Sequence, residues 1–518
     1  MKRTLALFMA ALLMLTMCGC DKKSKINTEQ SKKPSDTAEI SIYSYKPDTL
    51  CPILSKNEAN IQMLGIVYEG LISLSDSLYP DPCLADSWAV SDDGKVWTIT
   101  LRQDVLWHDG SAFGADDVIY TVNQIKKNQD SIYFYNVSNI KSIKSSGRDG
   151  LEIEVNEPWA NFVNLLYFPI IKQGTEEINP TVFTAVGTGP YIFEDRNEGN
   201  VFYLVKNERW WGKIPETDCI TVRMLPDNNT ALFAFSSGSI DMTLADDMNW
   251  GRFADPVLSS YTTMSTPVFH FVGFNHKNDA LALPEIRRAI SYAIDRTKII
   301  EETMMGYATA STMPIHPKWF VCGDKEIETT QNKKAAEKAL TDNHWELSEG
   351  VYKKTVEEHR LTTDFKILYN EENANREAIA KLIEKQLEEQ GFSIALEKVK
   401  FEDYQTRLND GEYDMFIGSY VVSPEIQFSP ITAEDNIFGF TNEKMLEAQN
   451  GLKTKYSISG IEEGYGAVID CFEELNPVAG LFFEDKVMIY NNRIKGEVAP
   501  SYFDLYCGIE TLRKEEAR

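Results

Sequence analysis

Apolar residues recur along the chain with two spacings, every second residue or every third to fourth, which are the spacings of strands and helices. Alternation predicts strands at residues 40–45 and 96–102. Helical spacing predicts helices at residues 115–126 and 284–295, and Pro284 suits the first turn of the second. Strands and helices therefore follow one another in mixed order, without an internal repeat.

Residues 365–399 combine both spacings. A buried strand is expected at 365–369 and a second strand at 392–399. Between them, residues 375–390 predict a helix that ends at Gly391. The apolar side chains expected on its inner face are Ile379, Leu382, Ile383 and Leu387. This strand–helix–strand order predicts an α/β protein with partly parallel sheets.

The first residues have the pattern of a bacterial lipoprotein signal. Lys2 and Arg3 precede an almost unbroken apolar stretch, 5–17, which is too short to span a bilayer comfortably. The stretch ends in Gly19-Cys20, which resembles a lipobox and makes Cys20 the expected lipidated residue; the alternative is a secretory signal cut elsewhere. Residues 1–20 are thus a predicted signal peptide with its lipobox, and the polar residues 21–38 a disordered tether.

Length and composition narrow the class of protein. A chain of 518 residues is too long for one simple core, so two or three lobes are expected. The net charge of −26 argues against nucleic acid as a partner, because phosphate backbones require a basic surface. Six of the eight cysteines are scattered and form no CxxC pair, so we expect free thiols or small buried hydrophobes.

The chain carries no recognisable catalytic motif. There is no P-loop with GK[ST], no HExxH and no GxSxG. The six histidines include no i, i+4 pair. We therefore expect no enzyme activity, no cofactor and no dedicated metal site.

Several segments in one order resemble a known family, the extracellular solute-binding proteins of family 5, which are the oligopeptide-, dipeptide- and nickel-binding lipoproteins of ABC importers. The longest is 79–125, with the run SDDG at 91–94 and ADDV at 115–118. The others are 68–71 (YEGL), 186–191 (VGTGPY), 207–212 (NERWWG), 237–241 (SGSID) and 286–296 (IRRAISYAIDR). The resemblance covers nearly all of residues 39–510.

The resemblance implies a periplasmic-binding-protein-like two-lobed clamp (type II, cluster C) with an extra α/β domain. Lobe I would be discontinuous, formed by residues 39–66, 185–270 and 491–518. The extra domain would be 67–184 and lobe II 271–490. The ligand would be held between the lobes, which close by hinge motion.

The resemblance also implies a ligand site, and there the chain departs from the pattern. Peptide-binding members carry a cleft loop whose aspartate pairs with the peptide α-amino group, and here the loop would be 413–425. Ser423 stands where the aspartate belongs, and serine supplies no charge for a buried ammonium. Either Glu425, the nearest carboxylate, substitutes for the aspartate, or the ligand is not held by a free N-terminus. The other expected ligand-binding residues are Gly418, Ser419, Tyr420 and Val421 in the loop, Phe401, Tyr404 and Arg407 before it, and Ser44 and Tyr45 at the end of the first strand.

Four functions stay open at this point. The first is capture of a small solute, an oligopeptide or dipeptide, for an ABC permease with a separate ATPase. The second is the same clamp for a sugar, an opine or a metal chelate. The others are a peptide-sensing receptor lipoprotein and a lipoprotein hydrolase. For the first we expect a monomer, lipid-anchored in the cell membrane and facing the extracellular or periplasmic side.

Overall fold

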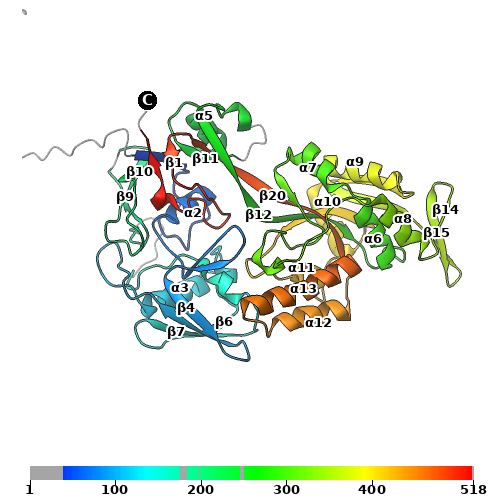
Figure 1. The fold of residues 1–518 in the computed structure, drawn as a ribbon, viewed down its shortest axis with the longest axis horizontal. Coiled ribbons are helices and arrows are strands. Elements are labelled where there is room, and N and C mark those ends of the chain that lie inside the picture. The colour runs from blue at the N-terminus through cyan, green and yellow to red at the C-terminus, as the bar shows by residue number, and fades with distance from the viewer. Residues whose placement is uncertain (1–38, 176–183, 197, 246–249, 516–518) are drawn as a thin grey trace, which may run out of the picture. The chain divides into compact units, whose positions relative to one another are not determined.

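The computed structural model describes residues 39–175, 184–196, 198–245 and 250–515, which belong to one structural unit (Figure 1). The predicted signal peptide, the tether and Cys20 lie outside these residues. Within them, no helix combines the length and the apolar character needed to cross a bilayer.

The first strand of the described chain joins strands from the middle of the sequence. A four-stranded sheet has the order β1 (Glu39–Ser44), β10 (Cys219–Met224), β9 (Val201–Lys206) and β8 (Tyr191–Glu194). β1 runs parallel to β10, and the other pairs are antiparallel. Ile40 and Ile42 alternate with less buried residues and are completely buried, as a strand with one core face requires.

A second four-stranded sheet lies in the segment expected as the extra domain. Its antiparallel order is β4 (Ala85–Val90), β5 (Val96–Leu101), β7 (Gly150–Val155) and β6 (Ile140–Ser145). Helices α3 (Ala115–Lys127) and α4 (Phe134–Ser138) lie between β5 and β6 in the sequence. Val118, Val122 and Ile125 of α3 are buried, as expected for a helix with one apolar face. These side chains belong to the same core cluster as Ile40 and Ile42, so the two sheets share one core.

The glycines of the VGTGPY segment allow backbone to approach backbone. A Cβ on Gly187 would lie 1.8 Å from the carbonyl oxygen of Val67, and one on Gly189 would lie 2.6 Å from that of Ile66. The amide of Gly189 donates to the Val67 carbonyl over 2.9 Å. Neither glycine has positive φ, so close approach rather than turn geometry requires them.

A seven-stranded sheet carries the longest strands of the described chain. Its order is β11 (Met242–Ala245), β20 (Val478–Asn491), β12 (Ser259–Phe274), β19 (Met415–Val421), β17 (Asp364–Asn370) and β18 (Ser393–Val399), with β13 (Ala308–Ala310) also on β20. In Figure 1, β12 and β20 run from the elements around β1, β10 and β11 to those around α6–α10.

The partners of β12 and β20 change along their length. Ser259–Ser265 pair with Asp485–Asn491, and β11 flanks that part of β20. Beyond a register shift between Ser265 and Phe269, β12 pairs on its other side with β19. Such a shift bends a strand locally. The lobe limits expected from the sequence stay a prediction.

The predicted strand–helix–strand unit is confirmed. β17 and β18 are parallel, and helix α9 (Ala374–Glu388) connects them. Of its expected inner residues Leu382 is only partly buried, and the other three are buried. Successive residues of β19 face opposite cores: Met415 and Ile417 pack with α9, and Phe416 packs with α13.

The remaining elements cover these sheets or connect them. The helices are α2 (Glu58–Leu64), α5 (Asn228–Ser236), α6 (Pro284–Ala293), α7 (Arg296–Met304), α8 (Lys333–Thr341), α10 (Phe401–Asp410), α11 (Ser429–Thr432), α12 (Glu443–Leu452) and α13 (Ile458–Leu475). The small sheets are β2 (Ile72–Leu74) with β3 (Pro80–Pro82), β14 (Glu346–Ser348) with β15 (Val351–Val356) and β16 (His359–Thr362), and β21 (Ile494–Lys495) with β22 (Arg513–Lys514). All six cysteines in the described part of the chain are free thiols, and four of them are buried.

Candidate functional site

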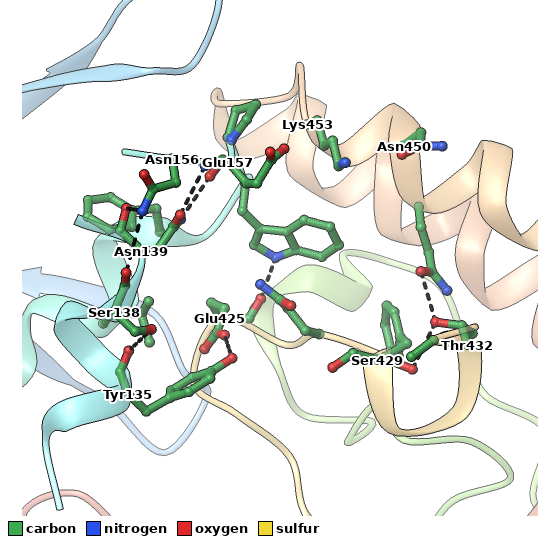
Figure 2. Close-up of a pocket in the computed structure, with 18 of the residues that line it drawn as sticks. Tyr135, Ser138, Asn139, Asn156, Glu157, Glu425, Ser429, Thr432, Asn450 and Lys453 are labelled. Carbon is green, nitrogen blue, oxygen red and sulfur yellow. Dashed lines mark hydrogen bonds between the residues drawn. The ribbon is translucent and has the colours of Figure 1, made fainter. Parts of the chain in front are cut away.

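A cavity of about 560 Å³ lies between two segments that are far apart in the sequence. Residues 135–165 form one wall, and residues 425–453 form the other (Figure 2). The volume is in the range of about 300–1,000 Å³ that is typical of ligand pockets. Its polar lining consists of Tyr135, Ser138, Asn139, Asn156, Glu157, Glu425, Gln427, Ser429, Thr432, Gln449, Asn450 and Lys453.

Glu425 is held in the wall by its backbone. It follows β19 in a turn in which the amide of Ile426 donates to the carbonyl of Ser423 over 2.8 Å. The Glu425 carbonyl accepts hydrogen bonds from the Trp159 indole, at 2.8 Å, and from the Tyr465 hydroxyl, at 3.0 Å. Because these donors come from the opposite wall and from α13, the position of Glu425 depends on the tertiary structure.

The Glu425 carboxylate is buried without a cation. The residue is 1% exposed, and it forms no ion pair among the described residues. Its Oε1 accepts a hydrogen bond from the Tyr135 hydroxyl, whereas its Oε2 has no partner in the described part of the protein. Burial raises the pKa of this carboxyl, and hydrogen bonds from Tyr135 and Ser423 oppose that rise. An unpartnered buried carboxylate oxygen is costly in free energy unless a ligand donates a hydrogen bond to it.

The end of α12 contributes polar groups of the opposite kind. Gln449 accepts a hydrogen bond from the Thr432 hydroxyl at its Oε1, over 3.1 Å, and its Nε2 is buried with no partner among the described residues. Lys453 is half-buried at the end of α12 and forms no ion pair in the ranges that the structure covers. The wall formed by residues 425–453 thus carries an unpartnered acceptor, an unpartnered donor and a cation.

With this geometry in view, comparison with known proteins assigns the family. The bacterial extracellular solute-binding proteins, family 5, match residues 80–440, which is more than half of the chain. The chain belongs to this family. The resemblance seen in the sequence is therefore confirmed, and the family is one of solute-binding proteins.

Three similar proteins illustrate the range of this family. The oligopeptide-binding protein AppA of Bacillus subtilis (strain 168) is 23% identical over 448 residues, which cover 80% of each chain. The glutathione-binding protein GsiB of Salmonella typhi is 28% identical over 286 residues, which cover 52% of this chain and only 54% of that one. NikZ from Campylobacter jejuni, solved in complex with Ni(L-His), is 22% identical with a TM-score of 0.63, covering 93% of this chain and 100% of that one. This last likeness shows the fold, and the two-lobed clamp expected from the sequence is confirmed.

In this family 5 protein, Ser423 and Glu425 come together with Tyr135. The Tyr135 hydroxyl donates to the Glu425 carboxylate, and Ser423 helps to lower the pKa of both groups. Glu425 lines the cavity, and Ser423 does not. Sequence reasoning missed Tyr135, Gln449 and Lys453, which stand in segments without a local functional signal.

The expected cleft loop is largely a strand. Gly418, Ser419, Tyr420 and Val421 belong to β19 and pair with β12, so the loop expectation is wrong for these four residues. The resemblance suggested a loop, whereas the first four residues of this strand are buried on both faces. Gly418 has no room for a Cβ, which would lie 2.7 Å from the Phe416 ring. The Ser419 hydroxyl accepts from Arg376 over 3.2 Å, the Tyr420 ring lies against Phe269 and Phe271, and Val421 is 57% exposed.

The other expected ligand residues lie outside the 560 Å³ cavity. Ser44 is fully buried at the end of β1, and Tyr45 lines a separate cavity of about 30 Å³. On α10, Phe401 is 45% exposed, and the buried Tyr404 donates its hydroxyl to the Ile417 carbonyl over 2.7 Å. Arg407 pairs with Glu397 at 3.0 Å. Their roles in ligand binding stay predictions.

Proposed function

We propose that this protein is the substrate-binding lipoprotein of an ABC importer and that it captures a peptide by its α-ammonium group at Glu425. The observation that carries the proposal is the buried carboxylate with an unpartnered Oε2 in a cavity of ligand size. The names of two relatives add support, because oligopeptides and glutathione are both peptides.

The physical argument rests on charge pairing. A desolvated ammonium requires a carboxylate, and charge-assisted hydrogen bonds are roughly twice as strong as neutral ones. Glu425 replaces the charge that Ser423 lacks, two residues further along the same turn. Tyr135 occupies one carboxylate oxygen, so the other is left for the ligand.

The direct test compares trialanine with N-acetyl-trialanine by titration calorimetry on the purified full-length protein in detergent. Acetylation removes the ammonium and is expected to weaken binding at least tenfold. Equal binding of the two peptides contradicts the proposal. If the protein binds nickel with L-histidine but binds neither peptide, a metal chelate is favoured as the solute, since NikZ was solved with that ligand.

Binding of free trialanine is also expected to depend on pH. The pKa of Glu425 is raised in the unliganded protein. As the pH falls through this raised pKa, a proton competes with the ammonium for the carboxylate. The affinity for the peptide is therefore highest at pH values above the pKa and falls at pH values below it. Titrations from pH 8 down to about pH 4 measure this loss, and a pH-independent affinity would contradict the assignment of Glu425.

We propose lipid attachment at Cys20, from the Gly19-Cys20 pair after the apolar stretch. Two or more acyl chains give stable anchoring where one does not. The Cys20→Ser variant is expected in the soluble fraction after cell lysis, with the wild-type chain and Cys18→Ser in the membrane fraction. Retention of Cys20→Ser in membranes, with release of Cys18→Ser, places the lipid on the other cysteine.

A further inference from the structure

A second cavity, of about 260 Å³, lies apart from the one that Glu425 lines, and the two share no lining residue. The charged residues that line it are Glu69, Asp504 and Glu510, and no lysine, arginine or histidine stands among its described lining residues. Carboxylates and the faces of aromatic rings both attract cations. The aromatic residues on its wall include Tyr133, Tyr167, Trp210, Trp211, Phe503 and Tyr506.

Glu69 gives this cavity a negative charge that only neutral groups contact. The residue is 9% exposed and forms no ion pair among the described residues. Its Oε1 accepts hydrogen bonds from the indole N–H groups of Trp210 and Trp211, at 3.1 Å each, and from the Cys83 thiol at 3.8 Å. Burial raises the pKa of Glu69 to about 7, and these hydrogen bonds oppose the rise. Because its oxygens already accept hydrogen bonds, Glu69 attracts a cation mainly by its charge.

Asp504 is the carboxylate that a cation can approach directly. Its Oδ1 accepts a hydrogen bond from the Tyr506 amide over 3.1 Å, and the side chain forms no ion pair with the described residues. Burial raises the pKa of Asp504 to about 6, and the charge of Glu510 raises it further. A buried carboxylate without a cation is costly in free energy, and a cationic ligand would offset that cost.

Two further residues are consistent with a cationic ligand. Tyr68 lines the cavity and is 3% exposed, and its hydroxyl has no hydrogen-bond partner in the described part of the chain. Arg102 does not line the cavity, but its guanidinium lies 4.0 Å from the centroid of the Trp211 ring. One ring of the wall therefore already has a cation over one face.

The size and the chemistry of the cavity favour an organic cation over a metal ion. No group of three or more His, Cys, Asp or Glu side chains among the described residues is placed to hold a metal. A water molecule occupies about 30 Å³ of the liquid, so a cavity of 260 Å³ holds roughly nine atoms of that size. The ligand is therefore a small molecule.

We propose that this second cavity binds a small organic cation of the quaternary ammonium class, with the cation between the aromatic rings and Asp504. A quaternary ammonium donates no hydrogen bond from its nitrogen, which suits a wall where the Glu69 oxygens are already occupied. Aromatic faces and a nearby negative charge hold such a cation. The proposal is independent of peptide capture at Glu425, because the two cavities share no lining residue.

The test is titration calorimetry with choline and its neutral isostere 3,3-dimethylbutan-1-ol, on the purified full-length protein in a detergent without ammonium groups. The isostere is expected to bind at least tenfold more weakly than choline. Asp504→Asn should weaken choline at least fivefold and leave the isostere unchanged, because asparagine keeps an acceptor for the Tyr506 amide. Asp81→Asn is the matched control. Asp81 is exposed and does not line the cavity, so the loss should be less than about twofold.

A second variant tests the aromatic wall. Phe503→Leu keeps an apolar side chain but removes the face of the ring, so it should weaken choline about threefold and the isostere by less. This split between a charged and a neutral ligand would not follow from a general loss of structure. The variant also provides a test if Asp504→Asn does not fold.

Four outcomes would overturn the proposal. Equal binding of choline and the isostere would show that the cavity does not recognise charge, and absence of choline binding would show that it takes no such cation. Equal losses in Asp81→Asn and Asp504→Asn would assign the effect to general surface charge. If Glu425→Gln weakens choline as much as Asp504→Asn does, the cation lies in the other cavity. This last comparison holds whether or not the protein binds peptides.

Discussion

Replacing Glu425 by glutamine is expected to weaken trialanine binding by at least 30-fold. Removal of one partner from a buried charge pair costs about 2–5 kcal/mol, which corresponds to roughly 30-fold to several thousand-fold in affinity. Glutamine keeps the shape of the side chain and the hydrogen bond with Tyr135. The lost affinity therefore reports the charge and not the packing. Calorimetry on the purified full-length protein measures it.

Glu157 provides a matched control in the same cavity. It lines the opposite wall but is exposed, so water solvates its carboxylate. Glu157→Gln is expected to change trialanine affinity by less than about threefold, in line with the small effects of exposed charges. In the Glu425→Gln variant, N-acetylation of the peptide should have almost no further effect. If the Glu425→Gln variant binds trialanine with wild-type affinity, the Glu425 carboxylate does not bind the peptide.

Replacing Arg287 by leucine is expected to lower the free energy of unfolding by about 3 kcal/mol or more. The guanidinium is buried and donates to four carbonyls, those of Leu281, Ala282, Leu475 and Asn476, at 2.6–3.2 Å. Burial lowers its pKa to about 10, which still leaves it charged at neutral pH. Each carbonyl left without a donor costs about 1–3 kcal/mol, partly recovered by relaxation.

The neighbouring arginine is the control for this stability prediction. Arg288 is on the same helix, α6, and makes no hydrogen bond or ion pair with the described residues. Arg288→Leu should change stability by no more than about 0.5 kcal/mol. Urea denaturation followed by circular dichroism compares the two variants, and equal losses would contradict the role given to Arg287. Because Leu475 ends α13, whose Tyr465 supports Glu425, weaker peptide binding by Arg287→Leu is expected as well.

The candidate site was only partly predictable. The resemblance directed attention to residues 413–425, and the missing charge at Ser423 singled out Glu425. The partners of Glu425 had no such signal: Tyr135 lies 290 positions away, in a helix of five residues, and Trp159 lies 266 positions away. The strand β19 was misassigned for a related reason. Its first four residues are buried on both faces, so they do not alternate between apolar and polar, and periodicity alone does not distinguish such a strand.

The sequence by itself determined the local elements and the family. Spacing of apolar residues specifies which face of a segment is buried, and this placed α3 and the β17–α9–β18 unit. Only the tertiary structure decided which atoms remain unpartnered. Whether Glu425 Oε2 or Gln449 Nε2 has a partner depends on which distant segments approach them, and hydrogen bonds are short and directional. The cavity and its unpartnered polar groups are therefore properties of chain packing, which no local pattern encodes.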